Sequence, residues 1–483
     1  MSKTEFQKSE TELQIEEIIP GGLGLGHHEG RAVFVPFTAP GDRIRVALLE
    51  KRRRHYRGRC LEVLEPGPLR VEPFCSHYET CGGCHLQHLS IEGQGEVKRG
   101  FVADSLRRLG KIDPEGILGE WIPAPSDKGY RRRAGLKVRW VKDKPLVGFF
   151  APASHRVVDL SECPILHPKL AEFIPALRDF IPHLKVRERL PHVDVVSGEN
   201  GPALVFHILS NPHGRDKDMM TGFAREHGAQ QVWIQRKGKE NLEEVWRGGG
   251  LTYQVDELTM RFDPGDFIQA NFEQNRRLVA ESMALAGSGE AAWDLFCGVG
   301  NFTLPLAKRF SRVRGIDSYG PGLRRAKTNA RKNSLDSVRF RKGNLSIEEE
   351  IPQSSGGMEI LLLDPPREGA VELVKKMPGL NPRQVIYVSC NPATFARDAA
   401  IMEDNGFKLE TVIPIDLFPN THHLELVARF INQREPIPKK EVAEITAEPP
   451  NQEGEMGEAG EEAKVEEIKV EEVKEESPGE IER

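Results

Sequence analysis

The stretch DLFCGVGNFTLPL, residues 294–306, decides the fold of the larger part of this chain. A strand-like run ends at Phe296, a Gly-x-Gly turn follows, and a helical run begins. Glycines let the backbone approach a ligand closely, and a helix N-terminus offers free N–H groups. The third glycine of a dinucleotide site is absent, because Thr303 stands in its place. With Asp317 ending the next strand-like run, the pattern favours S-adenosylmethionine, a nucleoside without a pyrophosphate, over an ordinary βαβ turn.

The sequence around this turn alternates regularly from about residue 263 onward. The strand-like runs are AAWDLF, RVRGID, EILLLD and QVIYVS, and helical segments separate them. Such alternation predicts a mostly parallel, doubly wound α/β sheet over residues 263–432. Ligands of these sheets bind at the carboxyl ends of the strands, so the residues there are candidates for a site.

Two of these strand ends carry reactive residues, in LLLDPPREG and in YVSCNPATF. From the residues alone, Cys390 is a buried small hydrophobe, a metal ligand or a nucleophile. The Asp364-Pro-Pro loop is similar to the Asp-Pro-Pro-Tyr loop of methyltransferases that act on exocyclic amino groups, but Arg367 replaces the tyrosine. Glu425 lies in the last apolar segment, either as an outward strand residue or as a carboxylate aimed into a site.

The N-terminal part of the chain has a different pattern of secondary structure. Residues 11–69 read as short strands punctuated by Gly, Pro and Asp, which predicts a small OB-like β-barrel. KRRRHYRGR, residues 51–59, holds six Lys and Arg and favours nucleic-acid binding over a solvated turn. Residues 96–260 mix helical and strand-like segments, as in an α+β domain. Within them, residues 130–140 are a second basic stretch that an alternating strand face explains almost as well as RNA contact.

Seven cysteines and no signal peptide argue against a disulfide framework and for a reducing, cytoplasmic location. Cys75, Cys81, Cys84 and the distant Cys163 suffice for a four-thiolate site. Thiolates suit zinc or an iron–sulfur cluster, and the spacing favours the cluster because zinc fingers usually pair their cysteines. Cys60 and Cys297 are expected to be small buried hydrophobes.

The charge is unevenly distributed. Residues 433–483 hold 17 Glu and seven Lys and Arg, a formal charge of −10, whereas the whole chain carries −6. The remainder is therefore mildly basic, and the acidic tail is expected to be disordered. No apolar run approaches ~18 residues, so no membrane helix is expected. No protein partner is evident, and we expect a monomer.

Five motifs, taken in order, resemble the RNA uracil-5-methyltransferase family: DFIQANFEQN, DLFCGVGNFTLPLA, LLLDPPREG, YVSCNPATFARD and DLFPNTHHLE. The front end resembles its ribosomal-RNA branch, which carries a TRAM barrel and a 4Fe-4S cluster. This implies a TRAM domain at 11–69, a cluster-bearing central domain at 70–262 and a methyltransferase domain at 263–432. The implied reaction is methylation of uridine C5 in 23S ribosomal RNA. A transfer-RNA uridine is the alternative, and a non-catalytic iron–sulfur RNA-binding protein a more distant one.

The resemblance also implies residue roles. Cys390 is the nucleophile that attacks uracil C6, and Glu425 is the base that removes the C5 proton. Phe267 stacks near the target uracil, and Gln269 polarises its edge with Asp364. The residues implied to line the S-adenosylmethionine site are Gln269, Phe296, Asn301, Asp317, Asn344 and Asp364. The cluster ligands implied are Cys75, Cys81, Cys84 and Cys163. Because attack requires a thiolate, we expect an electropositive setting for Cys390, from Arg367 or Arg397.

Overall fold

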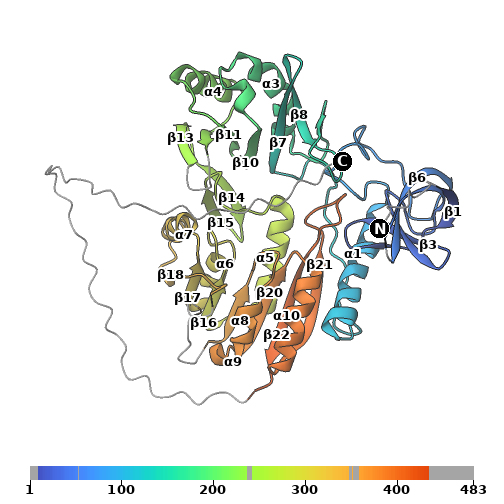
Figure 1. Ribbon diagram of the computed structural model, residues 1–483. Coiled ribbons are helices and arrows are strands. Elements are labelled where there is room, and N and C mark those ends of the chain that lie inside the picture. The colour runs from blue at the N-terminus through green and yellow to red at the C-terminus, as the bar shows by residue number, and fades with distance from the viewer. Residues whose placement is uncertain (1–8, 53, 237–241, 348–350, 352–357, 435–483) are drawn as a thin grey trace, which may run out of the picture. The chain divides into compact units, whose positions relative to one another are not determined.

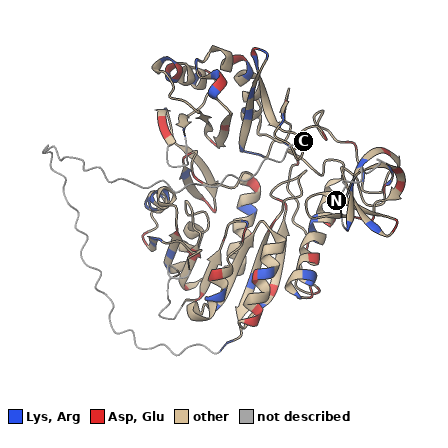
Figure 2. Ribbon diagram, in the orientation of Figure 1, with Lys and Arg blue, Asp and Glu red and all other residues tan. Residues whose placement is uncertain are grey.

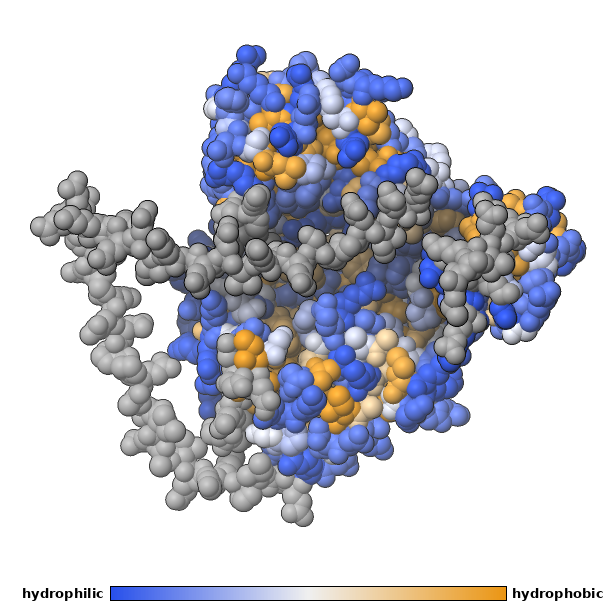
Figure 3. Space-filling model, in the orientation of Figure 1, coloured by the Kyte–Doolittle hydropathy of each residue, from blue (hydrophilic) through white to orange (hydrophobic). Residues whose placement is uncertain are grey.

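The computed structural model describes residues 9–52, 54–236, 242–347, 351 and 358–434, which contain four β-sheets (Figure 1). Beyond Arg434, the predicted acidic tail lies outside these residues. None of the described helices is both long enough and apolar enough to cross a membrane. On the face shown in Figure 3, apolar side chains form small groups set among hydrophilic ones.

The first sheet confirms the predicted N-terminal barrel. Its order is β1-β5-β6-β4-β3-β2. The strands are β1 (Glu10–Gln14), β2 (Glu17–Ile19), β3 (Leu23–His28), β4 (Arg31–Pro36), β5 (Arg43–Lys51) and β6 (His55–Glu65). β1 and β2 are separated by only two residues and form the two edges, so one continuous segment closes the sheet on itself. Inward residues such as Val33, Val35 and Val46 are fully buried and fill the barrel.

The central sheet has the order β13-β12-β11-β10-β7-β8-β9 and is antiparallel except between β11 and β12. Its strands are β7 (Arg133–Val141), β8 (Lys144–Phe150), β9 (Val157–Asp159), β10 (His192–Gly198), β11 (Gly201–His207), β12 (Gln231–Gln235) and β13 (Leu242–Arg247). Its helices are α2 (Pro168–Ala171), α3 (Phe173–Phe180), α4 (Gly214–Glu226) and two 3-10 turns, Ile181–His183 and Arg187–Arg189. These helices contribute to the same apolar core as the strands, which confirms a mixed α and β region.

Two other segments of residues 70–262 pack on the C-terminal sheet. One is α1 (Ile91–Ser105) with the π-helix Leu106–Gly110, whose apolar residues join the core of the C-terminal sheet. The other is the hairpin of β14 (Leu251–Val255) and β15 (Leu258–Phe262), which joins the core on the opposite face. The range predicted as one central domain therefore contributes to three apolar cores.

The C-terminal sheet has the order β18-β17-β16-β19-β20-β22-β21. Its strands are β16 (Gly289–Leu295), β17 (Phe310–Asp317), β18 (Val338–Lys342), β19 (Ile360–Leu363), β20 (Gln384–Ser389), β21 (Phe407–Ile415) and β22 (Glu425–Asn432). The first five are parallel, and β22 runs antiparallel between β20 and β21. The strand order reverses direction between β16 and β19, which marks the switch point where ligands bind in such sheets.

Helices cover both faces of this sheet. They are α5 (Phe272–Ala286), α6 (Thr303–Ala307), α7 (Gly320–Lys332), α8 (Val371–Lys375), α9 (Met377–Leu380) and α10 (Pro392–Asp404). The central strand β19 is apolar and buried at every position: Leu361 and Leu363 join one core and Ile360 and Leu362 the other. This two-sided burial confirms the doubly wound prediction. Figure 2 shows both acidic and basic residues on α1, α8 and α10, so these helices do not form a single-sign surface.

Candidate active site

The sheet register brings together three predicted residues that are distant in sequence. Ser389 pairs with Leu426 in the antiparallel ladder of β20 and β22, so the next pair outward is Cys390 with Glu425. In the parallel ladder on the other side, Leu363 of β19 pairs with Tyr387, so Asp364 follows at the same edge. Residues directly opposite in a ladder have Cβ atoms about 5 Å apart. A thiol and two carboxyls therefore meet at one edge of the sheet.

The turn that carries Cys390 is fixed by hydrogen bonds. Asn391 caps helix α10 by accepting the Ala393 N–H, and Pro392 occupies the first helical turn. The Asn391 side-chain amide also donates to the Arg367 carbonyl at 3.1 Å. The Thr394 hydroxyl donates to the same carbonyl at 3.0 Å. The two loops with the predicted reactive residues are thus tied together.

Burial dominates the electrostatics of this edge. Glu425 is only 4% exposed, and burial together with Asp364 raises the pKa of its carboxyl well above the usual range. Burial also raises the pKa of Asp364 to about 7. For the Cys390 thiol, burial and the carboxylates of Glu425 and Asp364 raise the pKa to about 12, although Arg367 acts to lower it.

The prediction of a partly ionised Cys390 is therefore wrong for this structure. Arg367 has the predicted influence, but it is exposed, and desolvation with two nearby carboxylates outweighs it. Arg397 is held elsewhere, because its guanidinium donates to the buried Asp398 and to the Glu368 carbonyl. The thiol is protonated at neutral pH, and a proton must leave it before it can act as a nucleophile.

Cys390 lies in a cavity of about 250 Å³. Residues from five separate parts of the chain line this cavity: Pro20, Gly21, Phe101, Ser105, Arg367, Cys390, Asn391, Pro392, Ala393, His422, His423 and Leu424. Pro20 and Gly21 belong to the turn between β2 and β3 of the barrel, and Phe101 belongs to α1. The barrel thus reaches the same cavity as the predicted nucleophile.

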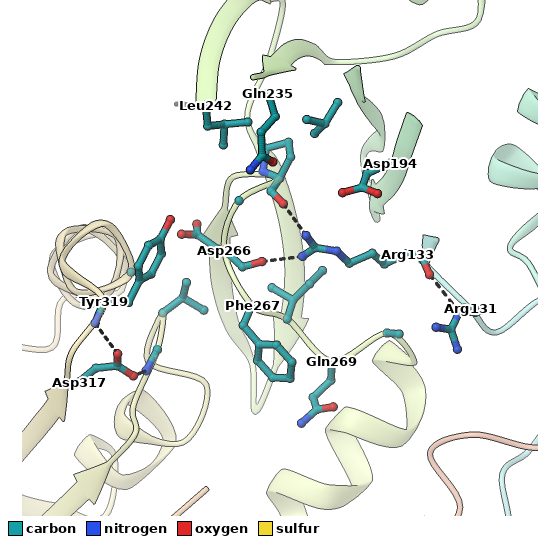
Figure 4. A pocket seen from close by; sticks show the side chains of 18 of the residues that line it. Arg131, Arg133, Asp194, Gln235, Leu242, Asp266, Phe267, Gln269, Asp317 and Tyr319 are labelled. Carbon is teal, nitrogen blue, oxygen red and sulfur yellow. Dashed lines mark hydrogen bonds between the residues drawn. The ribbon is translucent and has the colours of Figure 1, made fainter. Parts of the chain in front are cut away.

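A larger cavity of about 730 Å³ is lined by Asp317, Gln269 and Phe267, which are three of the residues expected at the S-adenosylmethionine and uracil sites (Figure 4). The Asp317 carboxylate accepts the N–H groups of Gly298, at 2.9 Å, and Tyr319, at 2.7 Å. Gln269 is buried, whereas Phe267 is 73% exposed at the cavity wall. A carboxylate at the end of the second strand suits ribose hydroxyls, and an exposed aromatic ring suits stacking on a base.

The other predicted cofactor residues do not line this cavity. Asn301 exchanges two hydrogen bonds of 2.9 Å with Asn275 and accepts the Tyr253 hydroxyl, so it braces the glycine turn. Phe296 begins that turn with a φ of 68°. Asn344 accepts the Ser346 N–H. Asp364 lies instead at the edge with Cys390.

Sequence reasoning missed several residues of the larger cavity, among them Tyr319 and Asp266. It had taken residues 130–140 as a candidate RNA contact, yet Arg133 donates to the Asp266 carbonyl at 2.7 Å and to the Pro264 carbonyl at 2.9 Å (Figure 4). Arg133 of this basic stretch thus holds the loop of residues 263–266 in place. The Asp-Pro-Gly-Asp turn of residues 263–266 is the sequence feature that could have indicated these cavity residues.

The four predicted cluster cysteines converge on one small cavity of about 30 Å³. All seven cysteines are free, and Cys297 is buried as predicted, while Cys60 is half-buried. Burial raises the pKa of the Cys81 thiol, and the backbone N–H of Gly83 opposes this effect, as the Gln87 side chain does at Cys84. Burial still raises the pKa of Cys84 to about 12 and of Cys163 to about 11. Buried thiols that face one another with N–H donors fit a bound metal or cluster, whose charge would ionise them.

A doubly wound sheet joined to an N-terminal barrel, with a carboxylate at the end of the second strand beside a cavity, is the fold class in which nucleoside-dependent enzymes are found. Residues 121–431 match the family model described as tRNA (Uracil-5-)-methyltransferase. Residues 12–69 match that described as tRNA (uracil(54)-C(5))-methyltransferase, TRAM domain. The chain belongs to the RNA uracil-5-methyltransferase family and carries its TRAM domain.

Individual relatives cover nearly the whole described chain. The 23S rRNA (uracil(1939)-C(5))-methyltransferase RlmD of Methylococcus capsulatus is 38% identical over 86% of this chain and 96% of the relative. The protein of the same name from Azoarcus sp. is 37% identical over 86% and 98%. Among solved structures, Pyrococcus abyssi tRNA (uracil-54, C5)-methyltransferase in complex with S-adenosyl-L-homocysteine is 26% identical, with a TM-score of 0.68, over 87% of this chain and 100% of that one.

Proposed function

We propose that this chain methylates C5 of one uridine in 23S ribosomal RNA. The observation that carries the reaction is the register of β20 and β22, in which Ser389 pairs with Leu426 and so brings Cys390 to the edge where Glu425 begins β22, near Asp364. The relatives named as 23S rRNA (uracil(1939)-C(5))-methyltransferases support the choice of RNA. The chain covers almost their full length, including the barrel.

Cys390 starts the reaction. Its thiol proton passes to the neighbouring Asp364, whose pKa of about 7 suits an acceptor at neutral pH. The Sγ atom then bonds to uracil C6, and the electrons of the C5–C6 double bond move to O4 as an enolate. The protonated Asp364 donates a hydrogen bond to that oxygen. C5 has now become a nucleophile.

Bound S-adenosylmethionine would supply the electrophilic methyl group that C5 takes up, with the S–CH3 bond broken and S-adenosylhomocysteine as the leaving group. Asp317 accepts hydrogen bonds from the ribose, Gln269 orients the ligand beside the uracil edge, and Phe267 stacks near the base. The remaining implied residues do not line the cavity, and we assign them a supporting role: Phe296, Asn301 and Asn344.

Glu425 completes the reaction. Its carboxylate removes the proton from C5, the C5–C6 double bond re-forms, and the Cys390 thiolate leaves C6. Burial suits this role, because the raised pKa of Glu425 makes it a stronger base than an exposed glutamate. The proton on Asp364 then returns to the Cys390 thiolate and the proton taken from C5 leaves Glu425, which restores the site.

The 4Fe-4S cluster belongs to this proposal as well. Cys75, Cys81, Cys84 and Cys163 would hold it and so join residues 75–84 to the central sheet. This link would support the path of the chain between the barrel and the Cys390 cavity, because His85 follows Cys84 and its ring meets the His422 ring edge-on, with centroids 4.6 Å apart. Iron and sulfide analysis of anaerobically purified protein, compared with Cys163→Ala, tests the assignment.

The deciding experiment is methyl transfer from labelled S-adenosylmethionine to RNA that lacks 5-methyluridine. We expect label in 23S ribosomal RNA at one uridine. Cys390→Ala should abolish transfer, and Glu425→Gln should accumulate a protein–RNA adduct that survives denaturation. Full turnover by Cys390→Ala would instead support an amino-group methyltransferase, and failure to bind S-adenosylmethionine would support a non-catalytic RNA-binding protein.

Transfer RNA is the second candidate substrate. The matching family descriptions name transfer RNA, and so does the name of the similar Pyrococcus abyssi enzyme. Label in the transfer-RNA fraction, with none in ribosomal RNA, would favour this alternative.

A further inference from the structure

A cluster of polar side chains on the central sheet has no part in the proposed methyl transfer. It consists of His192 and Asp194 on β10 and His207 on β11. Residues two apart on a strand point to the same face, and His207 is the direct register partner of His192. All three side chains therefore leave the sheet on one side, where their ligand atoms lie within 4.8 Å of one another.

This face looks into the larger cavity rather than into the core. Val193 and Val195, on the opposite face of β10, are fully buried in the central core. Asp194 and His207 line the cavity of about 730 Å³, and Figure 4 shows the Asp194 carboxylate beside the Arg133 side chain there.

The three groups are already arranged in part. His207 Nε2 lies 3.0 Å from an Asp194 carboxylate oxygen, and the rings of His192 and His207 stack with centroids 3.7 Å apart. Gly135, the register partner of Asp194 on β7, leaves room for the carboxylate, since a Cβ atom there would lie 2.9 Å from its oxygen.

The two nearby cationic side chains have other partners. Arg133 donates to the carbonyls of Pro264 and Asp266. Lys137, opposite His192 on β7, places its ammonium group 5.5 Å from the centre of the Phe150 ring. Neither cation forms a salt bridge with Asp194 among the described residues.

We propose that His192, Asp194 and His207 bind a divalent transition-metal ion, of which Zn²⁺ is the reference case. Two imidazoles and a carboxylate suit Zn²⁺, with bond lengths of about 2.0–2.2 Å. Tetrahedral geometry then requires ligand atoms about 3.4 Å apart, and in the structure they lie within 4.8 Å of one another. The fourth position faces the cavity and is open to water or to an oxygen atom of a bound molecule.

Zinc binding to the full chain tests this site. Equilibrium dialysis with Zn²⁺, followed by elemental analysis, should find one more zinc per chain in the wild type than in His192→Gln/His207→Gln. The matched control is His183→Gln/His213→Gln, which removes two exposed histidines and should retain the wild-type stoichiometry. All proteins are compared at equal iron content, because free thiols also bind zinc. Equal zinc in wild type and His192→Gln/His207→Gln would overturn the proposal.

A second measurement needs no variant and so does not depend on folding of one. Zn²⁺ should protect His192 and His207 of the wild type from diethylpyrocarbonate, as located by peptide mass spectrometry, and leave His183 and His213 reactive. Unchanged modification of His192 and His207 with and without Zn²⁺ would also refute the site.

Discussion

At the scale of single residues, the environment of Cys390 is the least intuitive feature. A nucleophilic cysteine is usually pictured beside a cation, yet Cys390 lies near the carboxyls of Glu425 and Asp364. In the mechanism that we propose, the same carboxyls that depress its ionisation take up the protons of the reaction. Formation of the thiolate would therefore depend on where those protons reside, and Arg367 contributes only a partial counter-charge.

We predict that Glu425→Gln lowers the pKa of Cys390, because it removes the carboxylate that acts most strongly, after burial, to raise it. The pH profile of Cys390 alkylation by iodoacetamide, followed by mass spectrometry, should shift to lower pH. Glu372→Gln, an exposed change on α8, serves as the control and should leave the profile unchanged. A Cys390 profile identical in Glu425→Gln and wild type would contradict this electrostatic account.

At the scale of elements, a buried ion pair joins α1 to the C-terminal sheet. The Lys98 ammonium donates to the Asp416 carboxylate at 2.8 Å and to the Phe418 carbonyl at 3.1 Å, and both charged side chains are at most 1% exposed. Asp416 directly follows β21, and Phe418 lines the cavity of about 730 Å³. The pair therefore positions the loop after β21, which leads into His422, His423 and Glu425.

We predict that Lys98→Met destabilises the protein by about 3–5 kcal/mol, because it leaves the Asp416 carboxylate buried and unpaired. Urea denaturation measures the loss. Arg108→Met, which removes an exposed partner of Asp104, should cost no more than about 1 kcal/mol. Lys98→Met/Asp416→Leu should recover part of the stability, and equal losses in Lys98→Met and Arg108→Met would argue against the pair.

At the scale of the whole molecule, His88 connects the barrel to the cysteine-bearing segment. Its Nε2 lies 3.0 Å from the Thr38 carbonyl, which can only accept, so Nε2 carries the proton. Its Nδ1 then accepts the Tyr78 hydroxyl at 2.6 Å. The imidazole is 1% exposed, and burial lowers its pKa to about 4.

We predict that this contact makes the protein acid-sensitive. The pKa of His88 in the folded chain lies below its unfolded value of 6.5, so below pH 6.5 the unfolded chain binds a proton that the folded chain does not. The stabilisation is complete above pH 6.5 and is lost as the pH falls towards 4, by on the order of 3 kcal/mol. Urea denaturation between pH 7.5 and 4.5 measures it, and His88→Asn should lower stability at pH 7 while flattening the pH slope. The idea fails if both proteins show the same slope.

The sequence by itself determined the fold class and, through the family that its motifs resemble, the reaction, and it nominated the candidate reactive residues. Strand-end motifs carry such information because parallel strands present their carboxyl ends at one edge, so DLFCGVGNF, DPPREG and SCNP point to a common site without coordinates. The cysteine set could likewise be predicted from the sequence, because the type and the number of the residues are enough to suggest a four-thiolate site. The short strands between residues 11 and 69 sufficed for the barrel.

Tertiary structure decided what depends on register, burial and packing between distant segments. Only the β20–β22 ladder places Glu425 opposite Cys390, and only the resulting burial shows that the thiol is protonated. Lys98 looks like a surface residue in sequence and becomes buried because α1 packs on a sheet more than 300 residues away along the chain. His192 and His207 likewise meet only through strand pairing. Desolvation and long-range contacts belong to the folded chain, so no local pattern contains them.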